Sequence, residues 1–137
     1  MKQHSTNYTN TFIEIAEDCS ASTGIIPPVK EGSKTIANLQ FELVWKQPYQ
    51  FTSDDVFFQV YAIRNDLTKS EFAEARKQFF SKGQPCFRAS PLTKTYGWGV
   101  HSDKDGKIAL VGCETKEYVK FAKDKSLKVI KAMKSKK

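Results

Sequence analysis

The chain has 137 residues, of which 39% are apolar and 12% aromatic, and its formal net charge is +7. This length suits one domain with a buried core, and the ten phenylalanines argue against a disordered chain. The N-terminal residues contain no apolar run, and no stretch of about 18 apolar residues occurs, which argues against a signal peptide and a membrane-spanning helix. We therefore expect a single cytoplasmic domain over residues 1–137 with no membrane partner.

The positive charge is concentrated at the C-terminal end. Residues 116–137 contain nine lysines against two acidic side chains, a balance of +7, so the first 115 residues are neutral. This asymmetry argues against a broad basic face and for a basic helix or tail. The three cysteines, Cys19, Cys86 and Cys113, have no C-x-x-C spacing, and we interpret them as reduced thiols without a disulfide or a zinc site.

The chain begins with a predicted strand, a loop and a helix. Residues 11–16 (TFIEIA) alternate apolar and polar side chains, which is typical of a half-buried strand. Residues 20–34 form a loop, because glycines and a proline pair leave no room for a regular element. A helix follows that Ser33 can cap and Pro48 stops.

Two further helices are predicted between residues 52 and 83. Residues 52–66 open with side chains that cap helices but are apolar nearly all round, so a helix is favoured and a central strand stays open as an alternative. The next helix is clearer, since Thr68 and Glu71 have the spacing of a capping box and Gly83 can close the helix.

The segment "CFRASPLTKTYGWGVHSDKDGKIALVGC" (residues 86–113) predicts a short turn and a hairpin. Ser90 followed by Pro91 is a helix-start signal, and Gly97 ends this single turn. The two strands that follow are joined through Asp105 and Gly106, a strong hairpin signal.

The length of this hairpin loop decides which side chains share a face. With a two-residue loop, Gly99 lies opposite Gly112 and leaves a bare patch of backbone, and His101 lies opposite Leu110. The core face then carries Trp98, Val100, Ala109, Val111 and Cys113. A three-residue loop with a bulge would exchange the faces of one strand and separate the two glycines.

The C-terminal part predicts a lysine-rich helical segment over residues 115–133, either one broken helix or two short ones, and a frayed tail over 134–137. We expect that helix to dock on the domain through Val119, Ile130 and Met133. The predicted fold class is therefore α+β, with a small antiparallel sheet, formed by the N-terminal strand and the C-terminal hairpin, covered by helices on one face.

Two groups of side chains are candidate binding sites. Polar and aromatic residues around the glycines suggest a cradle for a small molecule or an anion, and the candidates are Arg88, Lys94, Tyr96, Trp98 and His101. The structural alternative is a covered hairpin with solvated side chains. Three lysines on one arc of the terminal helix are candidate nucleic-acid contacts, namely Lys125, Lys128 and Lys131, and their alternative is a charged outer face.

No convergent catalytic set, metal site or cofactor motif is visible. Cys113 and His101 fall on opposite faces of the predicted hairpin, and the other histidine, His4, lies near the N-terminus. Asp103 and Asp105 are interpreted as turn residues because the further ligands of a calcium loop are missing. The sequence therefore predicts no catalytic residue, no metal and no cofactor.

Several stretches resemble a family of small bacterial proteins catalogued only as a domain of unknown function. They are "NYTNTFIEIAEDC", "ANLQFELVW", "TSDDVFFQVYAIRND", "SLKVIKAMKSK" and, most distinctively, "GQPCFRASPLTKTYGWG". This resemblance spans nearly the whole chain, implies a stand-alone cytosolic domain and implies no activity. More faintly, "YGWGVHSDKDGKIALVGC" is similar to a hairpin of the YjbR/MmcQ-like proteins, small α+β domains for which DNA binding has been proposed.

Two functional hypotheses follow. The leading one is a non-enzymatic binding domain whose partner is nucleic acid, because of the terminal lysines. The alternative is a small-molecule sensor or an enzyme with its site in residues 88–101. A cleft that gathers those side chains, with the glycines open to it, would favour the second.

Overall fold

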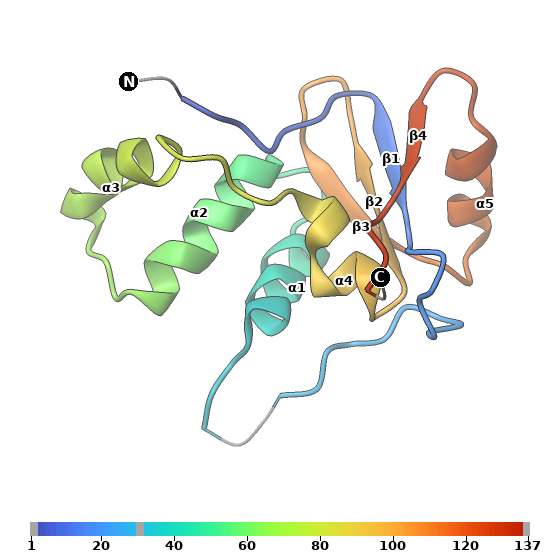
Figure 1. Cartoon of the computed structure of the whole chain (residues 1–137), viewed down its shortest axis with the longest axis horizontal. Coiled ribbons are helices and arrows are strands. Elements are labelled where there is room, and N and C mark those ends of the chain that lie inside the picture. The colour runs from blue at the N-terminus through green and yellow to red at the C-terminus, as the bar shows by residue number, and fades with distance from the viewer. Residues whose placement is uncertain (1–2, 30–31, 136–137) are drawn as a thin grey trace.

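One four-stranded sheet forms the centre of the fold (Figure 1). The computed structural model describes residues 3–29 and 32–135. The strands lie in the order β3-β2-β1-β4, with the bounds Thr11–Glu14 (β1), Trp98–Ser102 (β2), Ile108–Gly112 (β3) and Lys128–Lys131 (β4). β2 runs antiparallel to both neighbours, whereas β4 runs parallel to β1. The predicted α+β class is confirmed, but the sheet is mixed and not antiparallel.

Helices lie against both faces of this sheet (Figure 1). α1, α2 and α4 cover one face, α5 covers the other, and α3 packs on α2 at the periphery. The bounds are Ile36–Lys46 (α1), Ser53–Arg64 (α2), Phe72–Phe79 (α3), Pro91–Lys94 (α4) and Lys116–Lys123 (α5), with short 3-10 turns at Lys69–Glu71 (η1) and Phe87–Ala89 (η2). The prediction of helices on one face therefore omitted α5.

Capping side chains define where α1 and α2 begin. The Thr35 hydroxyl accepts a hydrogen bond from the Asn38 amide, and the Asn38 side chain accepts one from the Thr35 amide. Thr52 and Asp55 make the same reciprocal pair at the start of α2. Such a box satisfies two amides that a helix start leaves unpaired. The segment that the sequence left open is thus a helix, and the cap of α1 is Thr35 instead of Ser33.

The predicted capping box starts the 3-10 turn η1, which leads directly into α3 at Phe72. Glu71 accepts a hydrogen bond from the Thr68 amide at 2.9 Å, as the spacing indicated. The helix ends at Phe79, four residues before Gly83. Its aromatic side packs against Phe58 of α2, with Phe79 at 6.2 Å between ring centroids. α2 and α3 therefore form a small aromatic cluster beside the main core.

The register of the sheet assigns side chains to its two faces. Ile13, Val100 and Leu110 lie in one row across β1, β2 and β3, and all three belong to the main core under α1 and α4. Phe12 points to the opposite face, where its ring lies 5.0 Å from the Tyr118 ring of α5. Both faces are thus covered, as the nearly complete burial of β1, β2 and β3 requires.

The hairpin between β2 and β3 has a three-residue loop. The Asp103 amide donates to the Lys107 carbonyl, and the Gly106 amide donates to the Asp103 carbonyl. The Asp103 side chain accepts from the amides of Asp105 and Lys107, both at 2.9 Å. Gly106 adopts φ of +79°, the left-handed conformation that glycine tolerates best. This is the three-residue loop with a bulge, the second of the two alternatives.

The predicted pairing of the two glycines is therefore wrong. Gly99 lies opposite Val111, one residue away from the expected partner Gly112. A Cβ atom at Gly99 would lie 2.7 Å from the Phe12 ring and 2.9 Å from the Tyr118 ring. An aromatic ring and a helix thus cover Gly99, which is the structural alternative to a ligand cradle.

The predicted helix over residues 115–133 is also wrong in its second half. α5 ends at Lys123, and the chain then returns as β4 along the outer edge of β1. The sequence KVIK of β4 suits both structures, and the unpaired edge of β1 selects the strand. Lysines on an exposed edge strand also discourage pairing with other chains.

One of the three apolar side chains that were expected to dock the C-terminal segment on the domain packs against the main core. Ile130 lies opposite Ile13 and packs against the main core, whereas Val119 and Met133 are about half exposed. The tail is held further than predicted, because Lys134 forms an ion pair with Glu17 at 3.2 Å. The Ser135 amide also donates a hydrogen bond to an Asp18 oxygen at 2.9 Å. Residues 136–137 lie outside the described residues.

Candidate functional site

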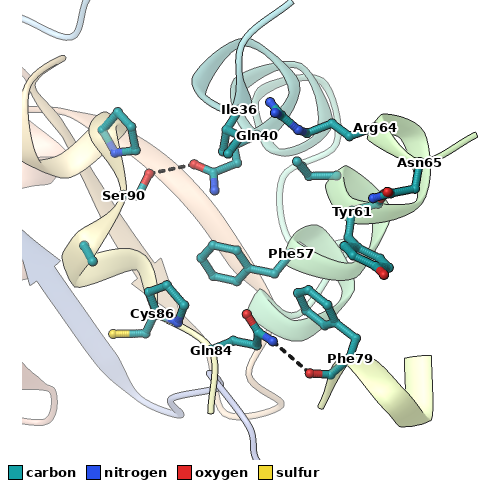
Figure 2. A pocket seen from close by; sticks show the side chains of 14 residues that line it. Ile36, Gln40, Phe57, Tyr61, Arg64, Asn65, Phe79, Gln84, Cys86 and Ser90 are labelled. Carbon is teal, nitrogen blue, oxygen red and sulfur yellow. Dashed lines mark hydrogen bonds between the residues drawn. The ribbon is translucent and has the colours of Figure 1, made fainter. Parts of the chain in front are cut away.

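A cavity of about 330 Å³ lies between α1, α2, the end of α3 and the segment that leads into α4 (Figure 2). Its size falls within the range of small-molecule pockets. Its lining residues are Ile36, Gln40, Phe57, Val60, Tyr61, Arg64, Asn65, Phe79, Gln84, Pro85, Cys86, Ala89, Ser90 and Pro91. The last six come from the distinctive stretch of the sequence, so that stretch forms one wall of the cavity.

Aromatic and aliphatic side chains make most of the wall. α2 is apolar on nearly all sides, so it can contribute Phe58 to the aromatic cluster and Phe57 to the cavity. The Phe57 ring lies 4.8 Å from the Phe87 ring, which anchors it to the main core. On the other side, the Tyr61 ring lies 4.8 Å from Phe79. The cavity is thus an apolar gap where the two clusters do not meet.

A buried polar pair interrupts this wall. The Ser90 hydroxyl donates to the Gln40 side-chain oxygen at 2.6 Å, and the same hydroxyl accepts from the Leu92 amide at the start of α4. Gln40 is 1% exposed and Ser90 is 3% exposed. Ser90 therefore caps α4, as the sequence predicted, and also fixes the orientation of the Gln40 amide.

The amide nitrogen of Gln40 is the unusual group of the cavity. Figure 2 shows it turned away from Ser90 and towards Phe57. No residue in the described part of the chain accepts a hydrogen bond from it. This donor borders the cavity and can be satisfied there by water or by an acceptor on a ligand.

The other polar side chains at the cavity differ in whether their donors already have a hydrogen-bond partner in the protein. The side-chain nitrogen of Asn65 donates a hydrogen bond to the Tyr61 carbonyl, and that of Gln84 donates one to the Phe79 carbonyl. Both amide groups therefore already have a backbone acceptor. Arg64, the last residue of α2, is exposed and makes no ion pair within the described residues. Besides the Tyr61 hydroxyl, which has no partner among the described residues, Gln40 and Arg64 are the lining residues whose side-chain nitrogens donate to no described residue.

The lining offers no nucleophile with a base. Figure 2 shows the Cys86 sulfur pointing out of the cavity, where it lies 3.5 Å from the Tyr8 hydroxyl. This contact and burial raise the pKa of Tyr8. None of the described residues that line the cavity is a histidine, aspartate or glutamate that could activate Ser90. Within the described residues, no cluster of three or more His, Cys, Asp or Glu side chains could hold a metal ion.

Residues 3–137 match the model of a family described as "Family of unknown function (DUF6157)". The chain belongs to this family. No curated protein and no solved structure matches the chain. Membership of a domain-of-unknown-function family agrees with the resemblance noted in the sequence, whereas the likeness to the YjbR/MmcQ-like proteins and a bacterial, cytoplasmic origin stay predictions. In the described part of this DUF6157 protein, no helix is long and apolar enough to cross a membrane.

The five candidate ligand residues of the hairpin region are spread over the DUF6157 fold. Trp98 is buried in the main core and donates from its indole nitrogen to the Ile25 carbonyl. Tyr96 packs at the edge of the same core. Arg88 donates to the Lys131 carbonyl, beside β4.

The remaining two candidates, Lys94 and His101, lie elsewhere in the fold. Lys94 ends α4, and His101 lies on the α5 face of the sheet. The His101 ring stacks on Phe121 at 4.1 Å, and its Nδ1 atom lies 2.8 Å from the Tyr49 hydroxyl. Burial lowers the pKa of His101, against the opposing effect of Asp103 and Asp124. None of the five lines the cavity, and a ligand role for them stays a prediction.

The candidate nucleic-acid lysines lie at and before β4. Lys125 is in the turn after α5, and Lys128 and Lys131 begin and end the strand. All three are exposed, and Lys131 forms an ion pair with Glu17 at 3.2 Å. Their role as phosphate contacts stays a prediction.

Sequence reasoning missed Gln40 and Arg64 altogether. The signals in the sequence were weak: a glutamine within an otherwise amphipathic helix, and an arginine at a helix end, are both common. A buried position for Gln40 could have been expected, because it lies about one turn from both Ala37 and Val44, on the face that α1 turns to the core.

Proposed function

We propose that this protein is a non-enzymatic binding domain for a small, largely apolar molecule that carries a hydrogen-bond acceptor. The observation that carries this proposal is the Gln40 amide nitrogen, a buried donor without a protein partner that faces a cavity of about 330 Å³. An apolar cavity with few, well-oriented polar groups is the usual form of a small-molecule site.

The energetics support an occupied cavity. An apolar ligand gains about 25 cal/mol for each Å² of apolar surface it buries, and aliphatic and aromatic side chains make most of the wall. The acceptor adds a hydrogen bond to a donor that is otherwise poorly satisfied. Because Ser90 already holds the Gln40 oxygen, the amide is oriented before the ligand arrives, which lowers the entropic cost of binding.

Binding is proposed in place of catalysis because the described lining of the cavity contains no base next to Ser90. Ser90 uses its hydroxyl hydrogen for Gln40, and its oxygen accepts from the Leu92 amide. A serine nucleophile needs an adjacent group that removes its proton.

The experiment uses hydrocinnamamide, a neutral molecule with one phenyl ring and one carbonyl acceptor, followed by NMR shifts of the protein amides. For a molecule of this size we expect a dissociation constant of about millimolar. Ala89→Leu fills the cavity and should abolish the shifts, whereas Ala73→Leu on the exposed side of α3 should leave them unchanged. Gln40→Leu removes the donor and should weaken binding. Absence of shifts in the native protein, or equal shifts in both alanine variants, would refute the proposal.

A second candidate function is nucleic-acid binding, supported by the exposed lysines on and after α5. Lys116, Lys120 and Lys123 follow one stripe of α5, and Lys125 continues it into the turn. Binding of short duplex DNA should then weaken steeply with added salt. Deleting the C-terminal segment is unsuitable as a test, because β4 is part of the sheet. Replacing these four lysines by glutamine should abolish binding, whereas Lys77→Gln on α3 should not; equal binding by both variants would exclude this function.

A further inference from the structure

We infer that the ligand of the cavity is a small apolar carboxylate, whose anionic group is held between the Gln40 amide and the Arg64 guanidinium. This inference rests on the proposed function and adds the chemical class of the ligand. It is carried by the position of Arg64 and by the lining of the cavity and of the hollow next to it, in which Lys34 and Arg64 are the charged side chains among the described residues.

Arg64 stands where two hollows of the surface meet. The first is the cavity described above, and the second is lined by Ser33, Lys34, Thr35, Ile36, Ala37, Arg64, Pro91 and Tyr96. Ile36, Arg64 and Pro91 line both, so these three residues form the mouth between the cavity and solvent. Figure 2 shows the Arg64 side chain reaching from α2 towards Ile36 of α1. A ligand that enters by this mouth passes the guanidinium.

The charges around the mouth favour an anion. Among the described residues, no aspartate or glutamate lines either hollow, whereas Arg64 lines both and Lys34 lines the second. Lys34 is partly neutralised by Glu42 at 2.9 Å, but Arg64 makes no ion pair with any described residue. A guanidinium presents paired N–H groups that match the two oxygens of a carboxylate, so Arg64 suits this group better than a single charge would.

One carboxylate can satisfy both donors. Gln40 follows Ile36 by four residues, about 6 Å along α1, and so lies about one turn away from the mouth. Arg64 is exposed and has a long side chain, so it can close over a carboxylate that accepts from Gln40. The apolar body of the ligand then extends along Phe57 and Val60.

The test compares hydrocinnamate with hydrocinnamamide, two molecules of equal shape that differ in charge. We expect the native protein to bind the carboxylate about tenfold more tightly than the amide, as charge-assisted hydrogen bonds allow. Arg64→Gln should reduce this preference to less than about twofold while it leaves amide binding unchanged. Lys77→Gln removes one charge on α3, far in sequence from the mouth, and should keep the full preference.

The outcomes separate the two proposals. If both molecules bind the native protein equally well, or if Lys77→Gln lowers the preference as much as Arg64→Gln does, the carboxylate inference is overturned and the binding function stands. If neither molecule binds, both are overturned. A preference that depends on Arg64 and falls with added salt supports the inference.

Discussion

Replacing Gly99 by alanine tests the packing of α5 on the sheet. Gly99 has an ordinary backbone conformation, so the substitution adds only a methyl group. That methyl carbon would lie 2.7 Å from the Phe12 ring and 2.9 Å from the Tyr118 ring. Atoms at such distances overlap, so one of the two rings or α5 itself must move.

The size of the effect follows from what can move. Phe12 is fully buried and also touches Phe121, so its ring has no room to retreat. Tyr118 accepts a hydrogen bond from the Ile15 amide at 2.9 Å, which ties α5 to the end of β1. Overpacking of this kind costs about 1–3 kcal/mol in the free energy of unfolding. For a domain of this length we expect the melting temperature to fall by about 3–5 °C for each kcal/mol.

Urea unfolding followed by circular dichroism measures this cost, and Gly83→Ala is the matched control. A Cβ atom at Gly83 would meet nothing within 4 Å, so that variant should be close to neutral. Hydrocinnamamide should bind folded Gly99→Ala as it binds the native protein, because Gly99 faces α5 and the cavity lies on the other side of the sheet. A Gly99→Ala variant as stable as Gly83→Ala would refute the packing of Phe12 and Tyr118 described above.

Three further predictions concern stability. Ile130→Asp should lower the free energy of unfolding by about 2 kcal/mol or more, whereas Lys128→Gln in the same strand should change it little, as thermal melts of both would measure. Burial raises the pKa of Tyr118 to about 12 from its usual value of 10, so the hydroxyl loses its proton at a higher pH in the folded state than in the unfolded state. The free energy of unfolding should therefore fall as the pH rises from about 10 to 12. Urea titrations across this range should find a smaller fall in Tyr118→Phe. Ser90→Ala removes the cap of α4 and the hydrogen bond to Gln40, which should cost about 1–2 kcal/mol in urea unfolding; a neutral result would contradict the buried pair.

The sequence indicated the starts of α2, η1 and α4 correctly because their signals are local, whereas it placed the cap of α1 at Ser33 instead of Thr35. Thr68 and Glu71 are three residues apart, and their hydrogen bonds need only one helical turn. The same holds for Ser90 before Pro91 at α4. The α+β class and the hairpin followed from patterns of similarly short range.

The sequence did not determine the hairpin register or the end of the chain. Both a two-residue and a three-residue loop are compatible with Asp105-Gly106. The two loops shift the pairing of the strands by one residue, and this shift moves every side chain of one strand to the opposite face of the sheet. The Asp103 side chain, which accepts two loop amides, stabilises the longer loop. Likewise, residues 128–131 suit a helix or a strand, and the open edge of β1 decides between them.

The candidate site is the part of the protein that only the tertiary structure decided. Gln40 and Ser90 are fifty residues apart in the chain, and neither has a neighbour in the sequence that marks it as a ligand contact. Arg64 lines the cavity only because the packing of α2 places its last residue beside α1. Composition and short-range patterns determined that this protein folds into an α+β domain, because helices and turns form from contacts within a few residues. The cavity arises where α1, α2 and the chain before α4 fail to close on one another, and that is a property of packing between distant segments.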